Sequence, residues 1–499
     1  MMSEGVEARE PPEAFPNRVK QRIARGERFR GLFASARGRD TRLLAVLSHG
    51  SALRTEETIV TSGADRFPSL TAAVPSAAWY EREVCDLFGL TSVGHPRPDS
   101  LIFPFTPVAL RPRPGSGSSS GPIEPNLTPL DTHLGGEGVF TIPYGPVRSG
   151  VFESIEYLVE TPGEDIPHLR TRVFYKHRGI EKRFEGMGVH DGVLLAERCE
   201  GVASVSHATA FCEAVERIGD KAIPVQAGIV RVLHAELERV ANHHDSTIRH
   251  TEAAGQAVAY ARFSLHKERV QRLRGELSGS RFGRGVVVPG GVTGSPALRS
   301  AELLAAVDRL EVAVRADMRL LLATPSFVDR LRATGVIPPE IALAFGALGP
   351  VGRGSGQTED IRFERPSLGY ARLGHQLPEP RSEGDALARQ RVRIEEIWGA
   401  FHLIRQAVDT LDELGEPEHG IWRVPIEAAS GEAFGWAEAP QGEVLYLVEL
   451  QDGVLLRVKP RSASFHNLAL FPSAFPNDIL TDFAFIEASF GLSIAGVAS

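Results

Sequence analysis

The sequence predicts an α+β protein with a small N-terminal α/β domain, a linker, and a larger, mainly helical domain with peripheral β-hairpins. Short strand-like runs separated by polar turns occupy the first part of the chain. A stretch rich in proline, glycine and serine follows them. Beyond it, long segments carry apolar residues at helical spacing. We therefore expect an N-terminal domain at residues 1–103, the linker at 104–135 and the large domain at 136–499.

The composition is that of an ordinary globular protein. At 499 residues the chain is too long for one compact core, so more than one domain is expected. Its formal net charge of -8 comes from 55 basic and 63 acidic side chains. That balance gives no cue for nucleic acid, and we expect none as a partner. No uninterrupted apolar run of about eighteen residues is present, so we expect no spanning helix and membrane association only through partner subunits.

The cysteines limit the metal chemistry and indicate a compartment. The chain has only three, Cys85, Cys199 and Cys212, and no two of them lie in a Cys-x-x-Cys spacing. An iron-sulfur cluster held by this chain alone would ordinarily need four thiolates, so we expect none. The odd number of cysteines and the lack of an apolar signal peptide favour a reducing, cytoplasmic location.

The N-terminal domain contains strands, a helix and polar turns. Residues 1 to about 20 are polar and contain proline, which predicts a loose arm. Apolar runs at 43–47 and 58–61 predict short strands. The segment 79–90 predicts an amphipathic helix whose charges face solvent.

The same helix carries the first specific motif. It contains Glu-Arg-Glu-x-x-Asp-Leu-Phe-Gly, and a Gly-His-Pro string follows it. This combination resembles the signature of the small hydrophilic core subunit of NADH:quinone oxidoreductase (respiratory complex I) and its hydrogenase relatives. It departs at Asp99, where the family prefers a basic residue or proline. The resemblance implies docking on neighbouring subunits through Glu81, Arg82 and Asp86.

The large domain opens with alternating segments at 142–150 and 155–160, which predict two strands joined by a loop. The loop resembles the Gly-Pro-x-His loop of complex I, in which the histidine contacts quinone. Arg148 stands in the place of that histidine. Quinone reduction by that route is therefore not supported at this position.

A second motif, His-Arg-Gly-x-Glu-Lys, includes His177 and Arg178. By themselves these two residues would be surface or capping residues next to Gly179. The string also resembles hydrogenase and complex I large subunits, in which it lies against the subunit with the electron-delivering iron-sulfur cluster. The resemblance implies that the Arg178 guanidinium stabilises the reduced, more negative cluster of a partner.

The next segment resembles a metal-binding motif that has lost its ligands. Large subunits of nickel-iron hydrogenases carry a similar Arg-x-Cys-Gly-x-Cys-x-x-x-His string, whose two cysteines bind the nickel-iron centre. In this chain Arg198, Gly201 and His207 match that string. Glu200 and Ala203 stand at the two cysteine positions. The tyrosine that complex I uses for quinone would fall near Gly201, which has no side chain.

The end of the chain also lacks cysteines at the positions where hydrogenases have metal ligands. It resembles the hydrogenase segment that leads to Asp-Pro-Cys-x-x-Cys, with Ser493 and Gly496 at the cysteine positions and Gly491 at the aspartate. A nickel-iron centre needs four soft thiolates, and the four aligned positions supply none. Shifting the alignment by one residue recovers Cys199 alone. We therefore expect no metal site in this chain.

Two long helices are predicted at 225–244 and 301–322, where apolar residues recur at helical spacing. In the first, Glu236, Arg239 and His243 share a second face, which could be solvated or could form a buried ion-paired row. The solvated face is the default expectation. A less favoured interpretation is a metal site, which would need further ligands beside His243, His244 and His250.

Three later strings also resemble the family. Gly-Pro-x-x-Arg-x-Ser-Gly at 349–356 lacks the Gly-Lys-Ser/Thr ending of a phosphate-binding loop, so nucleotide binding is not expected there. The charged residues of 385–396 fall on a predicted helix, for which surface ion pairing is the simplest expectation. The string at 438–443 resembles a family hairpin, with Gln441 in place of arginine.

The resemblance as a whole is to a fused small and large subunit of the catalytic module of energy-converting (membrane-bound) nickel-iron hydrogenases and complex I. The type implied is the one without nickel-ligating cysteines. It implies an oxidoreductase component of an NAD-linked respiratory complex, with quinone as the one cofactor left open. The implied partners are an iron-sulfur small subunit, antiporter-like subunits and other subunits of a membrane arm. The expected location is cytoplasmic, peripheral on the inner face of the cell membrane.

Two alternatives remain open at this point. The chain could be a non-catalytic scaffold that couples an iron-sulfur subunit to an ion-translocating membrane arm. It could also be an unrelated soluble enzyme with a metal at Asn242-His243-His244. In the redox interpretation the candidate catalytic residues are Arg198, Glu200 and His207. The candidate cofactor-binding residues are His177, Arg178 and Arg148.

Overall fold

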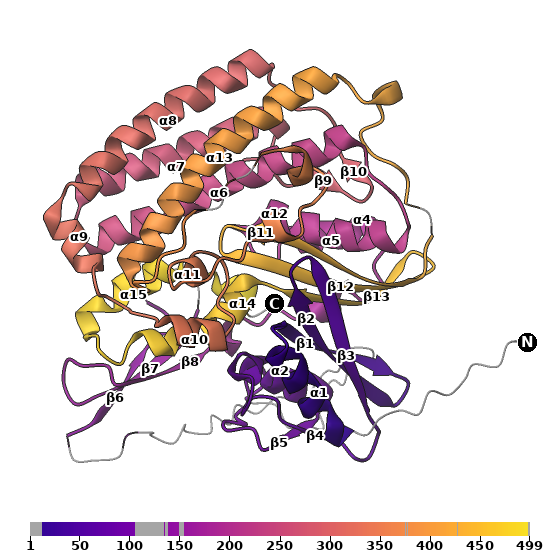
Figure 1. Cartoon of the computed structure of the whole chain (residues 1–499), viewed down its shortest axis with the longest axis vertical. Helices are drawn as coiled ribbons and strands as arrows, with labels where there is room; N and C mark the ends of the chain where they lie inside the picture. The colour runs from indigo at the N-terminus through magenta and orange to yellow at the C-terminus, as the bar shows by residue number, and fades with distance from the viewer. Residues whose placement is uncertain are drawn as a thin grey trace, which may run out of the picture.

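The computed structural model has the predicted fold class, with a small sheet-containing domain packed below a larger, mainly helical domain (Figure 1). The predicted linker at 104–135 lies almost entirely outside the described residues. Among the described residues, none of the helices combines the length and the apolar character needed to span a bilayer. The structure describes residues 12–104, 134, 138–148, 154–374, 376, 378–426 and 428–497.

The N-terminal domain is built on a three-stranded antiparallel sheet of order β1-β2-β3. The apolar run Leu43–Leu47 is buried because it lies on β2, the central strand of this sheet. A short parallel pair, β4 and β5, completes the strands of this domain. The elements are α1 (Phe15–Ala24), β1 (Arg28–Arg37), β2 (Asp40–His49), β3 (Ala52–Val60), β4 (Arg66–Pro68), α2 (Ala78–Phe88) and β5 (Thr91–Val93).

The prediction of a loose arm up to about residue 20 is wrong from Phe15 onward. Phe15 and Val19 are fully buried, one helical turn apart on α1, which packs against β3. Burying each of these side chains contributes about 1.5–3 kcal/mol relative to leaving it in water. These two buried apolar residues, together with the ion pairs of Arg18 and Arg22 to Glu56 of β3, hold this short helix on the domain.

Two antiparallel sheets form the periphery and the floor of the large domain. The sheet β6-β7-β8 lies at one edge, and the sheet β11-β12-β13 lies between the long helices and the N-terminal domain (Figure 1). The strands of these two sheets are β6 (Phe140–Tyr144), β7 (Glu156–Thr161), β8 (His168–Arg172), β11 (Gly431–Ala439), β12 (Gly442–Gln451) and β13 (Val454–Arg461), and β9 (Val287–Val288) and β10 (Gly291–Val292) form a separate antiparallel pair.

Four long helices, α6, α7, α8 and α13, pack side by side over a common apolar core (Figure 1). The helix α5 lies against β11 and β12. The longer helices are α5 (Ser204–Ile218), α6 (Val225–Ala253), α7 (Ala257–Ser278), α8 (Ser300–Leu322) and α13 (Ala386–Leu414). The shorter ones are α3 (Ile180–Phe184), α4 (Val189–Ala196), α9 (Pro325–Leu331), α10 (Pro339–Ala344), α11 (Gly349–Arg353), α12 (Ile361–Glu364), α14 (Ala463–Leu468), α15 (Phe483–Phe490) and α16 (Ile494–Val497).

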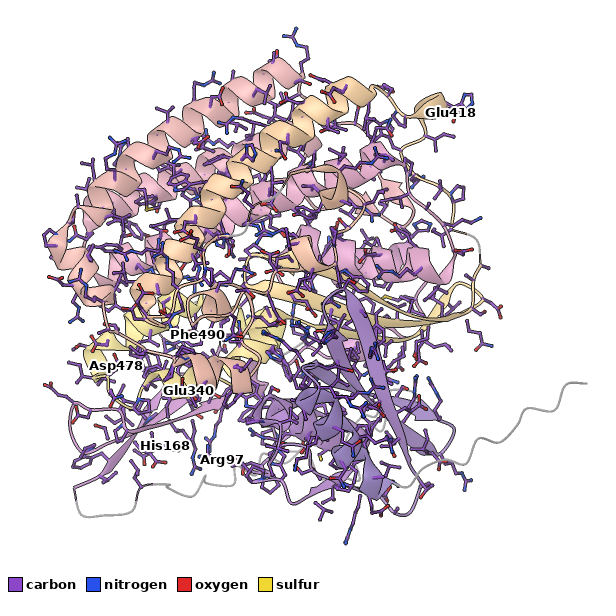
Figure 2. The ribbon with its side chains drawn as sticks, viewed as in Figure 1. Arg97, His168, Glu340, Glu418, Asp478 and Phe490 are labelled. Carbon is purple, nitrogen blue, oxygen red and sulfur yellow. The ribbon has the colours of Figure 1, made fainter. Side chains whose placement is uncertain are left out.

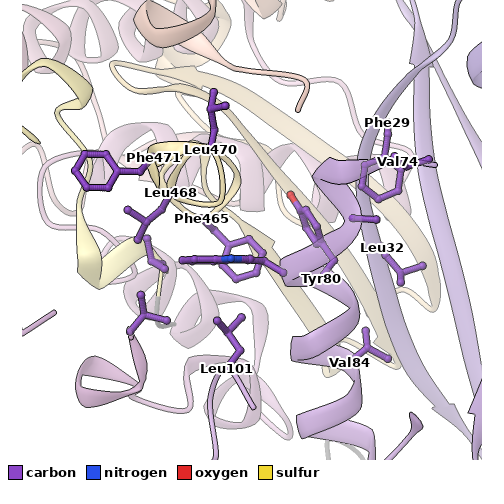
Figure 3. Close-up of a cluster of buried hydrophobic side chains, with 14 of the residues drawn as sticks. Phe29, Leu32, Val74, Tyr80, Val84, Leu101, Phe465, Leu468, Leu470 and Phe471 are labelled. Atoms are coloured by element: carbon purple, nitrogen blue, oxygen red, sulfur yellow. The ribbon is translucent and has the colours of Figure 1, made fainter. Parts of the chain in front are cut away.

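The two domains share one hydrophobic core. Tyr80 of α2 packs edge to face on Phe465 of α14, with 5.0 Å between the ring centroids. Figure 3 shows this contact within a cluster that runs from β1 and α2 to the C-terminal segment. A buried ion pair adds to it, since Lys459 Nζ of β13 lies 2.6 Å from Glu83 of α2. The N-terminal domain is therefore fixed to the large domain and does not hang from a linker.

The expectation that Glu81 and Asp86 contact neighbouring subunits is wrong. The Glu81 carboxylate is fully buried and accepts hydrogen bonds from Ser69 and Ser92 of its own domain. Asp86 accepts backbone N–H groups of residues 101–103. Arg82 donates to the carbonyl oxygen of Asp99 at 2.7 Å. These side chains hold the loop after α2, because buried polar groups need hydrogen-bond partners.

Candidate functional site

The two segments that resemble halves of a metal site lie against each other. Glu200 lies in the loop between α4 and α5, and Gly496 lies on α16. A Cβ atom added to Gly496 would lie 2.6 Å from Glu200 Oε2 and 3.1 Å from Ser462 Oγ. Such a contact is too short for any side chain without movement of the carboxylate. The Glu200 carboxylate therefore fills the space into which a side chain at position 496 would project.

Glu200 is almost completely buried, with 1% of its surface exposed. One carboxylate oxygen accepts a hydrogen bond from Ser464 Oγ at 3.0 Å. The other lies 3.2 Å from His207 Nε2. Both oxygens thus have partners, which a buried carboxylate requires.

His207 continues this polar chain toward the sheet. Its Nδ1 lies 2.8 Å from the Tyr446 hydroxyl on β12, and that hydroxyl donates to Cys199 Sγ at 3.4 Å. A continuous row of hydrogen bonds thus runs from Glu200 through His207 and Tyr446 to Cys199. We call these four residues, with Ser464, the Glu200 cluster.

The electrostatics assign charges within the Glu200 cluster. Burial by itself lowers the pKa of His207, but hydrogen bonds to Cys199 and Glu200 outweigh it and raise that pKa to about 9. Burial raises the pKa of Tyr446 well above its ordinary value, so the phenol stays neutral. At neutral pH an imidazolium therefore donates to the Glu200 carboxylate and to the Tyr446 oxygen.

Arg178 joins the two segments through their backbones. Its guanidinium donates to the carbonyl oxygens of Arg198 and Ala495, both at 2.8 Å, and to that of Cys199. A planar guanidinium suits such a role because its donors point in fixed directions. Arg178 therefore ties the loop before α5 to the C-terminal segment.

The other three predicted site residues lie elsewhere or point away. The Arg198 side chain is 51% exposed and lies beside Glu197. His177 packs edge to face on Phe103, and its burial lowers its pKa to about 4. Arg148 pairs with Glu487 at 2.7 Å and lies over the Tyr157 ring. The structure thus brings together Glu200, His207 and Arg178. Among the described residues, no side-chain hydrogen bond or ion pair joins Arg198, His177 or Arg148 to them.

Tyr446 and Ser464 belong to the Glu200 cluster but were not among the predicted residues. Tyr446 lies in an apolar strand, where an aromatic residue reads as core. Ser464 lies on the short helix α14, near its Ser462 N-cap. Neither position carries a local signal, because the partner of each within the Glu200 cluster is hundreds of residues away in sequence.

The donor set does not fit a nickel-iron centre. The whole chain has three cysteines, and one of them, Cys199, belongs to the Glu200 cluster. Cys212 lies on the buried face of α5 in the apolar core, and Cys85 lies on α2 of the N-terminal domain. A centre held by four soft thiolates cannot be assembled from these side chains.

A large cavity of about 1190 Å³ lies apart from the Glu200 cluster, between α2 with its following loop and strand β8. Trp79, His95 and Phe174 are among its lining residues. Arg97 reaches across to His168, with 3.1 Å between their nitrogen atoms (Figure 2). None of the Glu200 cluster residues lines this cavity. Space for a sizeable ligand and the buried polar chain are therefore separate features.

A second polar region lies between α6, α13 and β11. It consists of guanidinium and carboxylate groups in direct contact, each nearly or fully buried. The expectation of a solvated face on α6 and of surface ion pairs on α13 is therefore wrong. We call this region the arginine-carboxylate network, and its members are Arg239, Arg353, Arg362, Glu236, Asp360, Glu396 and Glu438.

The histidines that suggested a metal site have different partners. His243 Nε2 lies 2.7 Å from Glu396 Oε2, at the edge of the network. His244 Nδ1 contacts the carbonyl oxygen of Val240, and His250 contacts Gln390. Burial lowers the pKa of His243 to about 4, so the ring is neutral. Among the described residues no group of three or more His, Cys, Asp and Glu side chains is arranged to hold a metal ion.

Similarity to known proteins agrees with the resemblance inferred from the motifs. Residues 255–423 match the family described as respiratory-chain NADH dehydrogenase, 49 Kd subunit. Residues 27–111 match the family described as respiratory-chain NADH dehydrogenase, 30 Kd subunit. The chain thus carries in one polypeptide the two parts that the motifs predicted.

Individual relatives are of two kinds. Formate hydrogenlyase subunit 5 of Escherichia coli is 29% identical over 412 residues, which cover 80% of this chain and 71% of that protein. Membrane-bound hydrogenase subunit alpha of Pyrococcus furiosus is 29% identical, covering 70% of this chain and 84% of that protein. An NADH-quinone oxidoreductase subunit of Methylacidiphilum infernorum is 30% identical, covering 70% and 88%. The chain therefore belongs to the family of the respiratory-chain NADH dehydrogenase 49 Kd subunit and its hydrogenase relatives, with a 30 Kd subunit domain fused on its N-terminal side.

Proposed function

We propose that this chain is the large-subunit component of a membrane-associated respiratory redox complex that works without a nickel-iron centre. The observation that carries the proposal is the position of the Glu200 carboxylate, which occupies the space beside Gly496 where a ligand side chain would project. The presence of only three cysteines in the chain supports it. The relatives named as hydrogenase and NADH-quinone oxidoreductase subunits support the membership of such a complex.

In this proposal the electrons come from an iron-sulfur cluster of a partner subunit. Arg178 would lie between that partner and the Glu200 cluster, and its fixed positive charge would favour the reduced cluster. Reduction of a quinone to a quinol takes up two electrons and two protons. His207, an imidazolium held by Glu200, is the group in this cluster suited to donate a proton to such an acceptor.

The partners and location follow from the same proposal. An iron-sulfur small subunit would cover the face formed by the loops at Arg178 and Arg198. Antiporter-like and other membrane-arm subunits would hold the complex at the inner face of the cell membrane. The relative named as a membrane-bound hydrogenase supports this placement.

A second function, a non-catalytic scaffold that couples the iron-sulfur subunit to the membrane arm, is favoured by one observation. Glu200, His207 and Tyr446 are each no more than 1% exposed, so an acceptor reaches them only if the residues that cover them move. In the scaffold the Glu200 cluster and the arginine-carboxylate network would transmit conformational change instead of protons.

The first experiment tests the nickel-free proposal. The complex that contains this chain is purified, its nickel content is measured by elemental analysis, and hydrogen uptake is assayed with an artificial electron acceptor. We expect nickel far below one atom per chain and no hydrogen uptake. Stoichiometric nickel together with hydrogen uptake would refute the proposal.

The second experiment separates the redox role from the scaffold. Quinone reduction by the assembled complex is compared for wild type, His207→Gln and His402→Gln, the last an exposed histidine on α13. The redox role predicts a loss of about 10²-fold or more for His207→Gln only, the contribution typical of a positioned acid or base. Unchanged electron transfer in a correctly assembled His207→Gln complex would leave the scaffold as the better description.

A further inference from the structure

The arginine-carboxylate network contains one more carboxylate than it has guanidinium groups. The contacts among the described residues link Arg239, Arg353 and Arg362 to four carboxylates. His243 touches one of them, but burial keeps its ring neutral. A buried net charge is costly in a low-dielectric interior, so a proton on one carboxylate would balance the network.

We propose that Glu438 is a proton-binding site, and that it holds the one exchangeable proton of this network near neutral pH. The proposal does not depend on the redox function above, since it concerns a group outside the Glu200 cluster. It gives the chain a buried site that can take up or release a proton when the charge on a neighbouring subunit changes.

The contacts distinguish Glu438 from the other three carboxylates. Glu236 contacts Arg239 at 3.1 Å and Arg362 at 3.2 Å. Asp360 and Glu396 likewise each contact two arginines, with nearest distances of 2.7 Å. Glu438 contacts one arginine, Arg353, at 3.1 Å, and its other oxygen has a weak 3.3 Å contact with a backbone N–H. The carboxylate with the fewest cationic partners is the one on which a proton is most stable.

The electrostatics agree with that order. Burial and the negative charge of Asp360 raise the pKa of Glu438 to about 7, despite the nearby Arg353. By contrast, the charge of Arg353 and a hydrogen bond from His243 outweigh burial at Glu396 and hold its pKa well below the ordinary value. The same network therefore contains a carboxylate that is ionised throughout and another that titrates near neutrality.

Space for a water molecule that could exchange a proton with Glu438 lies beside it. A small cavity of about 30 Å³, large enough for one water molecule, is lined by Glu438, Ser206, Thr209 and Arg365. Thr209 Oγ1 and Arg365 Nε face this region as buried polar atoms that have no hydrogen-bond partner within the described residues. These groups provide the polar lining that a bridging water needs.

The neighbouring elements define the field at Glu438. Ser206 is adjacent in sequence to His207, so α5 separates this cavity from the Glu200 cluster. Several titratable and charged groups face Glu438 or its cavity from the packed elements. They are Arg353 on α11, Asp360 and Arg362 at α12, Arg365 after it, Glu236, Arg239 and Arg231 on α6, Glu396 on α13, Tyr370, and Glu443 opposite Glu438 on β12.

The test compares the full chain with Glu438→Gln and Glu443→Gln. Infrared spectroscopy in ²H₂O follows the carbonyl band of a protonated carboxylic acid as the pH is raised. We expect the wild type to show such a band that disappears with a midpoint near pH 7. Burial also raises the pKa of Glu83 and of Glu364 to about 7, so these two carboxyl groups contribute to the same band in every variant. The band should be weaker by one carboxyl group in Glu438→Gln and of full intensity in Glu443→Gln. An undiminished band in Glu438→Gln, or a wild type without a band, would overturn the proposal.

A thermal unfolding series provides the second measurement. The folded state binds the proton more tightly than the unfolded chain. The unfolding temperature of the wild type should therefore decrease as the pH rises from about 4.5 to 7. Glu438→Gln should show a smaller fall, because Glu83 and Glu364 still titrate in this range, and it should have a higher unfolding temperature than wild type at alkaline pH. Glu443→Gln should lower the midpoint at every pH, because Arg461 and Arg365 lose their buried partner. If Glu438→Gln does not fold, wild-type protein with isotope-labelled glutamate gives the infrared titration by itself, and a missing band still refutes the proposal.

Discussion

The Glu200 cluster and the arginine-carboxylate network are equally buried but are built on different principles. The Glu200 cluster joins one carboxylate directly to one histidine, and the Ser464 and Tyr446 hydroxyl groups extend this pair on either side. The segments around it are tied through backbone carbonyl groups, which accept hydrogen bonds from Arg178 and Ser462. The network alternates guanidinium and carboxylate groups from α6, α11, α13 and β11. The first can change its side chains without leaving many charges unpaired. The second cannot. We therefore call the network the frame, and we expect substitutions in it to cost more stability than substitutions in the Glu200 cluster.

The largest expected effect is in the network. Arg353→Met keeps the length of the side chain but removes the cation that contacts Glu396, Asp360 and Glu438. Because buried carboxylates lose their partner, the free energy of unfolding should fall by about 3–5 kcal/mol. Urea denaturation of the full chain followed by circular dichroism measures it. A change in the free energy of unfolding below about 1 kcal/mol would show that the network contributes little to the stability of the fold.

The second effect concerns the charge on His207. The pKa of His207 in the folded state, about 9, lies above that of an unfolded histidine. The charged ring therefore adds to the free energy of unfolding in full below about pH 6.5, and this contribution is lost as the pH rises through 9. We expect wild type to lose about 2–3 kcal/mol of stability across this window. His207→Gln and Glu200→Gln should lose less. Urea denaturation at pH 6.5 and 9.5 measures the difference.

The two buried regions affect stability in different pH ranges. Glu438 affects stability between about pH 4.5 and 7, whereas His207 acts above about pH 6.5. Equal slopes for wild type and His207→Gln in the upper window would show that the histidine is neutral in the folded protein.

The third effect tests whether Glu200 fills the space beside Gly496. Gly496→Ala should cost about 1–3 kcal/mol, because the added methyl group meets the carboxylate at 2.6 Å. Combined with Glu200→Ala it should cost less than the sum of the two single changes, with a coupling of about 0.5–3 kcal/mol. Thermal and urea unfolding of the four proteins of this cycle measure the coupling.

The matched control for this cycle is Gly399→Ala, since an added Cβ at Gly399 on α13 meets nothing within 4 Å. It should be neutral or stabilising by up to about 1 kcal/mol. Additive costs for Gly496→Ala and Glu200→Ala would mean that the carboxylate does not occupy this space.

The smallest effect is expected at the surface. Arg272 pairs with Glu268 at 2.8 Å, but its side chain is 72% exposed. Arg272→Met should change the free energy of unfolding by no more than about 0.5 kcal/mol. Measured beside Arg353→Met in the same denaturation series, it shows how much of the network's contribution comes from burial. A loss as large as that of Arg353→Met would contradict this explanation.

By itself the sequence determined the fold class, the fused small and large subunit parts and the two segments that meet at the centre. Those conclusions rest on local strings, such as the Arg198–His207 segment, and on apolar periodicity. Both can be read from the order of residues along the chain. Only the tertiary structure decided which of the singled-out side chains meet, namely Glu200, His207 and Arg178, and added Tyr446 and Ser464.

The tertiary structure also decided where charge is buried. Charged residues three and four apart on α6 and α13 look alike in sequence whether they face water or another element. Here those faces meet each other and β11, so Glu236, Arg239 and Glu396 are fully or almost fully buried. Burial depends on which elements pack together, and that depends on contacts between residues far apart in the chain. The physical reason is that desolvation is a property of the packed molecule, while spacing is a property of the chain.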